Sequence, residues 1–133
     1  MLDMPMGDAL IWVVRTHGLT IVHISSPSLP ATLTSIKNAV PEGADVVLVS
    51  ATVHTLTPRY AERIVEELRP RLVIPHHFES FFVPLKENLD DKDRADGESF
   101  VKRIRDLGVK AQMPQPFVEV IVSDLLLPAR IHP

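Results

Sequence analysis

Apolar positions along the chain follow two different periods, and the change between them separates expected strands from expected helices. Residues 9–16 and 19–24 are short apolar runs rich in β-branched side chains, with the turn signal His17-Gly18 between them. This pattern predicts a β-hairpin. Residues 31–40 carry apolar side chains at helical spacing and predict a short helix.

The middle of the chain predicts a strand, a helix and a second strand in succession. Residues 45–50 form an apolar run typical of a buried strand. Thr57 is suited to cap a helix and Pro58 to occupy its first position, so we expect a helix to run from there to about Arg69. Residues 71–74 form the next apolar run. A strand–helix–strand unit of this kind places two parallel strands in one sheet.

The last third of the chain is less regular. Residues 88–97 are highly charged and predict an exposed loop, whereas 98–107 have the apolar spacing of an amphipathic helix closed by Gly108. Residues 109–113 predict a short strand, and residues 118–122 predict a second strand with a clearer strand pattern.

Together these elements predict a single α/β domain over residues 1–133, with residues 1–8 and 124–133 as peripheral segments. The chain contains 133 residues, of which 45% are apolar and 23% charged, an ordinary globular balance. A formal net charge of −3 without a basic block argues against nucleic-acid binding. No apolar run is long enough to span a membrane, and the first residues lack the pattern of a secretory signal.

Cysteine is absent, which excludes disulfides and thiolate metal ligands and fits a reducing, cytoplasmic location. Histidine is therefore the main candidate for metal chemistry, because neutral imidazole is the commonest protein metal ligand. His76 and His77 directly follow the strand that we expect to stop at Pro75, and ligands gather where strands of such units end. The alternative, a pair of loop histidines bonded to nearby backbone, has equal weight.

Two other histidines have weaker signals. His54 follows the strand at 45–50 and should leave the sheet at the same end as His77, although a solvated loop residue is the more common outcome. His23 alternates with apolar neighbours on its strand, so we expect it to be packed or exposed at an edge.

The stretches 43–49, Thr57-Pro58 and 68–78 resemble the C-terminal half of metallo-β-lactamase-fold hydrolases. The nearest subgroup is the set of metal-dependent hydrolases that includes the ascorbate-phosphate lactonase type, and the resemblance covers about residues 9–123. It implies half of an αββα sandwich, that is, a mixed β-sheet with helices on one face.

The resemblance also implies a metal ligand. Members of the family typically have the sequence Pro-x-His-aromatic after this strand. The matching residues here are Pro75-His76-His77-Phe78, so His77 would be the ligand and His76 the variable position. Ser26 stands where the family has a bridging aspartate, and the His-x-His-x-Asp-His motif of the N-terminal half is absent. A catalytic zinc site needs about three protein ligands, so we expect the isolated chain to hold no catalytic Zn²⁺ or other divalent ion.

Three functions follow from this resemblance. The first is a truncated relative of metal-dependent hydrolases that is not catalytic on its own. The second is an active hydrolase of lactones, esters or phosphoesters, completed by a missing N-terminal half or a partner chain. The third is a non-catalytic homodimer in which two copies cover each other's sheets, with an apolar surface formed by Leu10, Trp12, Val14, Ile21 and residues 125–127.

Overall fold

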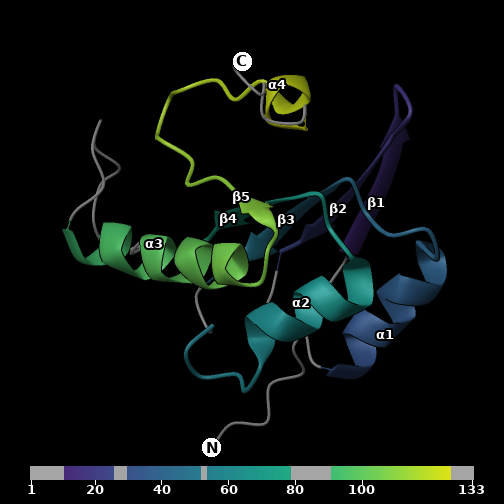
Figure 1. The fold of residues 1–133 in the computed structure, drawn as a ribbon, viewed down its shortest axis with the longest axis horizontal. Coiled ribbons are helices and arrows are strands. Elements are labelled where there is room, and N and C mark those ends of the chain that lie inside the picture. The colour runs from purple at the N-terminus through teal and green to yellow at the C-terminus, as the bar shows by residue number, and fades with distance from the viewer. Residues whose placement is uncertain (1–10, 26–29, 52–53, 79–90, 127–133) are drawn as a thin grey trace, which may run out of the picture.

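The computed structural model describes residues 11–25, 30–51, 54–78 and 91–126. Within these residues one mixed sheet has the strand order β1-β2-β3-β4-β5. Helices α1, α2 and α3 all lie on one side of it, and the short helix α4 lies on the other (Figure 1). The bounds are β1 Ile11–Thr16, β2 Leu19–Ile24, α1 Pro30–Ala39, β3 Val46–Ser50, α2 Tyr60–Leu68, β4 Leu72–His76, α3 Asp91–Asp106, β5 Lys110–Ala111 and α4 Val122–Leu126.

The predicted hairpin is confirmed. β1 and β2 pair antiparallel, with Trp12 opposite His23 and Thr16 opposite Leu19. Two residues close the hairpin, His17 with a φ of 48° and Gly18 with a φ of 73°. Positive φ at both positions is the type I′ turn, whose twist matches that of the flanking strands.

The predicted strand–helix–strand unit is confirmed as well. β3 pairs parallel with β4, and β2–β3 and β4–β5 are also parallel. Asp45 ties the amino ends of three strands together, because its carboxylate accepts from Thr20 N at 2.8 Å and from Arg71 Nη1 at 2.9 Å. Burial acts to raise the pKa of the Asp45 carboxyl, but the Thr20 N–H and the Arg71 guanidinium outweigh it and hold that pKa below its usual value.

The core lies between the sheet and α1–α3. Alternate residues of the parallel strands point toward the helices and are fully buried, as the period of two requires. We call this side the helix-covered face. It packs against the apolar stripes of the helices, and the cluster includes Val22, Ile24, Leu33, Ile36, Val47, Val49, Ala61, Ile64, Leu68, Val73, Phe100, Val101, Ile104 and Ala111.

The predicted start of α2 is wrong. Tyr60 is its first helical residue, and Arg59 occupies the N-cap position with a φ of 57° and no side-chain capping bond. The left-handed backbone at Arg59 separates Thr57 and Pro58 from the helix, so Thr57 is not the cap. Tyr60 is instead fixed from the core side, where its hydroxyl donates to Ser50 O at 2.8 Å.

β4 does not stop at Pro75 as expected; it runs on through His76. Proline has no N–H, so it cannot donate to a neighbouring strand at a position where the ladder requires a bond. β5 pairs only with Leu72 and Val73, so in the described part of the chain no strand lies beside Pro75 on that edge. The position therefore tolerates proline.

The expected loop at 88–97 is wrong where the structure describes it, because α3 begins at Asp91. Gly97 is buried within this helix, and a Cβ built on it would lie 2.8 Å from Met113 Sδ. The glycine thus permits the chain after β5 to pack closely on the helix, whereas the sequence pattern placed it in the charged loop.

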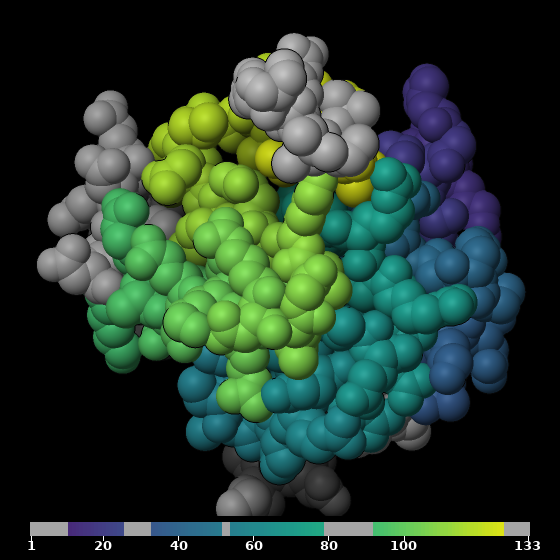
Figure 2. Space-filling model, viewed as in Figure 1, coloured from purple at the N-terminus to yellow at the C-terminus, as the bar shows by residue number. Residues whose placement is uncertain are grey.

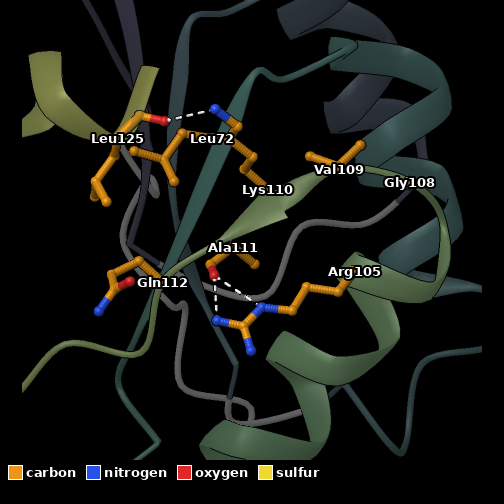
Figure 3. Close-up of a pocket in the computed structure, with 8 residues that line it drawn as sticks. All are labelled: Leu72, Arg105, Gly108, Val109, Lys110, Ala111, Gln112 and Leu125. Carbon is orange, nitrogen blue, oxygen red and sulfur yellow. Dashed lines mark hydrogen bonds between the residues drawn. The ribbon is translucent and has the colours of Figure 1, made fainter. Parts of the chain in front are cut away.

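The expected strand at 118–122 is also wrong, since residues 118–121 belong to no strand and α4 begins at Val122. The short strand expected at 109–113 is confirmed as β5. Its outer edge is occupied by Arg105, whose guanidinium donates to Ala111 O at 3.0 and 2.7 Å (Figure 3). A further strand therefore lacks an acceptor on this edge.

Candidate functional site

The face of the sheet away from α1–α3, which we call the open face, carries two histidines near the carboxyl ends of its strands. His23 on β2 and His76 on β4 both lie on it, by the alternation of their strands, near the carboxyl ends. Ser50 lies between them at the end of β3, in register with His76. This is the edge at which open α/β sheets bind ligands.

His23 and His76 are in contact. Their ring centroids are 4.9 Å apart, and the ring planes are inclined by 31°. His76 Nε2 lies 3.0 Å from Ile24 O. A carbonyl oxygen only accepts, so Nε2 carries the hydrogen and the lone pair of the neutral ring is on Nδ1. The small side chain of Ser50 lets His76 reach across β3 to the end of β2.

His77 leaves the strand ladder at this point. Ala51 N still donates to His76 O at 2.9 Å, but His77 has a φ of 54°. A non-glycine residue in this region is uncommon, and such backbone clusters at functional sites. Strand alternation would have placed the His77 side chain on the helix-covered face, and the left-handed backbone removes that constraint.

His54 does not join this group. Its ring packs edge-on against Phe100 at a centroid distance of 5.4 Å, so it lies on the helix-covered side. Burial lowers the pKa of His54, although the nearby Asp96 acts in the opposite direction. The residue lines a pocket of about 440 Å³ together with Thr55, Thr57, Pro58, Arg59, Ser99, Lys102, Arg103 and Asp106.

The cations of that pocket already have acidic partners. Arg103 pairs with Glu62, and Lys102 Nζ lies 2.6 Å from Asp106. The Arg103 guanidinium, opposed in part by burial, holds the pKa of the Glu62 carboxyl below its usual value. The Arg103–Glu62 pair links α3 to α2, whereas the Lys102–Asp106 pair lies within α3. Arg59, the remaining cation of the lining, pairs with Glu66, so each cation of the pocket has an acidic partner.

A second pocket, of about 420 Å³, lies between β5 and α4 (Figure 3). Its two cations are bound to backbone, Arg105 to Ala111 O and Lys110 Nζ to Leu125 O at 3.1 Å. No acid and base converge among its described lining residues, and the pocket has no evident catalytic use.

The described residues do not fit a complete metal site. Nowhere in the ranges that the structure describes do three or more His, Cys, Asp or Glu side chains gather closely enough to hold a metal ion. Ser26, at the position where the resemblance expects a bridging carboxylate, lies outside those ranges. His23, His76 and His77 are therefore at most part of a ligand set. Ligation by His77, His76 or His54 remains a prediction.

Sequence reasoning missed His23 as a member of this group. Two signals pointed to it: its place one residue before the end of β2, and the period of two that puts it on the same face as His76. What could not be read was the strand order, which brings β2 and β4 to either side of β3.

Comparison with known proteins gives similar relatives but no matching family model. A UPF0173 metal-dependent hydrolase from one strain of Thermus thermophilus is 32% identical over 114 residues, which is 85% of this chain and 44% of the relative. A UPF0173 metal-dependent hydrolase from a second strain of the same organism matches equally. The chain thus spans less than half the length of the curated relatives it matches.

Solved structures share the fold at low sequence identity. CmlA, a diiron β-hydroxylase from Streptomyces venezuelae, superposes with a TM-score of 0.53 and 15% identity over 79% of this chain and 26% of that chain. A variant of CmlA gives a TM-score of 0.52 at the same identity and coverage. The chain is therefore similar in sequence to proteins named metal-dependent hydrolases, and its mixed five-stranded sheet with α1–α3 on one face is consistent with half of a metallo-β-lactamase-like fold.

Proposed function

We propose that this chain is half of a metal-dependent-hydrolase-like domain and is not catalytic by itself. The observation that supports this is the ligand count: three histidines lie at the carboxyl ends of β2 and β4, and the described residues bring no ligand cluster of three or more together around them. A complete site needs about three ligands and one open position. The length of the relatives, more than twice the matched segment, supports the same proposal.

In a completed domain, a Zn²⁺ or other divalent ion would supply a water of lowered pKa for hydrolysis. In such a domain, this chain would contribute His77 as a ligand just beyond the end of β4. His76 would hold the end of that strand through its bond to Ile24 O, with the His23 ring packed beside it. Such supporting contacts fix the direction of a ligand.

Metal binding by the purified chain tests the proposal. We would dialyse the chain against Zn²⁺, Mn²⁺ or Fe²⁺, measure bound metal by plasma mass spectrometry, and compare His77→Ala with His17→Ala, a turn residue, as the control. We expect substoichiometric metal and no hydrolysis of lactone, ester or phosphoester substrates. About one tightly bound ion per chain that His77→Ala removes, together with hydrolysis, would overturn the proposal.

A second candidate is a hydrolase completed by another polypeptide. The open face favours it, because Trp12 and Val14 on this face are 58% and 45% exposed and offer a surface to a second sheet. Co-expression with the part of a Thermus relative outside the match would then yield a complex whose hydrolysis requires both metal and His77. A soluble complex without activity would exclude this candidate.

The lack of cysteine supports a cytoplasmic location for either form. Among the described residues no helix has both the length and the apolar character that crossing a bilayer requires.

A further inference from the structure

β1 ends the sheet on the side away from β5, and its outer edge is the feature that carries a new inference. The strand lies at the margin of the molecule, where no described element continues the sheet (Figures 1 and 2). Its side chains Trp12 and Val14 are largely exposed on the open face. An exposed edge strand is a template for pairing with another strand.

The turn determines which backbone groups of β1 face outward. In a hairpin closed by a two-residue type I′ turn, the flanking pair Thr16 and Leu19 exchanges hydrogen bonds, and bonded pairs then alternate along the ladder. Val14 and Trp12 are therefore bonded inward to β2. The N–H and C=O groups of Ile11, Val13 and Arg15 are left pointing outward.

These outward groups are symmetric about Val13. If a second copy of β1 pairs antiparallel about a two-fold axis at this residue, Val13 lies opposite Val13 and Ile11 opposite Arg15. On the open face, each Trp12 then lies opposite Val14 of the other copy. This position is a non-hydrogen-bonded pair, in which side chains approach most closely.

The two free edges of the sheet differ in how they are protected. On β5 the outward-facing carbonyl oxygen of Ala111 already accepts hydrogen bonds from the Arg105 guanidinium. β1 has neither proline nor lysine, and its one charged residue, Arg15, is held toward α1 by a bond from Nη2 to Ala39 O at 2.8 Å. In the symmetric pairing Arg15 faces Ile11, so no like charges oppose each other.

We propose that this chain forms a two-fold symmetric homodimer through antiparallel pairing of β1 with β1 of a second copy, giving one continuous ten-stranded sheet. The partner is a second copy because the edge is complementary to itself in hydrogen bonding, in its Trp12–Val14 contact and in charge. The proposal does not rest on metal chemistry. The contact in this dimer lies at the edge of the sheet. The sequence instead predicted that two copies cover each other's open faces.

Solution mass with edge variants tests this dimer. We expect light scattering of the wild-type chain to give about twice 14.8 kDa at high concentration. In Trp12→Lys/Val14→Lys, cross-strand lysines oppose each other and should weaken dimerisation by roughly tenfold or more. Leu56→Lys, at a position 78% exposed in the segment before α2, is the matched control and should dimerise normally. A wild-type monomer, or a dimer unaffected by the double substitution, would overturn the proposal.

Cross-linking tests the register independently of dimer strength. The chain has no cysteine, so Val13→Cys introduces a single thiol at the proposed axis. Paired residues in this position have Cα atoms about 5.5 Å apart, within the range of a disulfide. Mild oxidation should yield a covalent dimer from Val13→Cys and none from Leu56→Cys at equal concentration. Equal cross-linking of the two variants, or none from Val13→Cys, would contradict this pairing. Circular dichroism of each variant verifies that it remains folded.

Discussion

The two faces of the sheet differ in what they bury. On the helix-covered face, Val47 and Val73 are fully buried against helices that include Phe100, and most of the apolar cluster has almost no exposed area. The open face carries His23 and His76 and exposes Trp12. The helix-covered face thus supplies most of the core. The open face keeps histidines and apolar surface available toward β1, although Val46 and Leu72 on the same face are buried as well.

This difference shows how a sheet with helices packed on one face can bury a core while part of its other face stays exposed. A sheet needs one well-covered face to bury enough apolar surface, and α1, α2 and α3 provide that cover. The β1 end of the open face, where Trp12 and Val14 are exposed, is then available for another contact.

The largest expected effect comes from Phe100→Ala on the helix-covered face. Phe100 has no exposed area and contacts the rings of His54 and Tyr60, so its removal should lower the free energy of unfolding by about 3–5 kcal/mol. Trp12→Ala, on the open face, should cost less than about 1 kcal/mol in the monomer. Urea unfolding at low protein concentration measures both. Equal losses would contradict the comparison of the faces.

Gly43→Ala should destabilise the connection into β3 by about 1–3 kcal/mol. Gly43 has a φ of 94°, and a Cβ there would lie 3.1 Å from Leu68 O at the end of α2. Gly18→Ala, also at positive φ but with nothing near the added atom, is the control for backbone strain alone. Thermal melts of the two variants should show the larger loss at Gly43, and a larger loss at Gly18 would argue against this close packing.

Tyr60→Phe tests the polar link between α2 and β3. Burial raises the pKa of the Tyr60 hydroxyl, which stays neutral and donates to Ser50 O. Removing it should cost about 1 kcal/mol with little change in packing. Chemical denaturation compared with Tyr60→Leu, which also removes the ring, separates the bond from the packing. No loss in Tyr60→Phe would show that the hydroxyl does not hold the end of β3.

The smallest expected effect is a pH dependence from His54. Because burial lowers its pKa in the folded state, the unfolded chain takes up the proton first as pH falls below the usual 6.5. Stability that is present at neutral pH should therefore decline toward pH 5, before the carboxylates titrate. His54→Gln should show a flatter profile over this window when unfolding free energy is measured at each pH. An unchanged slope would assign the dependence to other groups.

The sequence predicted the local elements that have a strong period or a clear turn. The hairpin about His17-Gly18 and the unit from β3 to β4 follow from β-branched runs and a turn that only positive φ satisfies. The errors fall where tertiary contacts override local signals. Within α3, position 97 is a glycine because a Cβ there would collide with Met113, so the glycine does not mark a loop. Pro75 is tolerated in β4 because β5 is too short to need its N–H.

For the site, the sequence by itself determined which residue types were available: six histidines, no cysteine, and a histidine pair after a strand. Only the tertiary structure decided which of them meet. The strand order places His23 in contact with His76. The ring of His54 packs against Phe100 of α3, on the opposite face of the sheet. The period of two along a strand assigns each residue to one face of the sheet, and this can be read from the sequence. Which residues on that face become neighbours depends on how strands and helices that are distant in the sequence pack together.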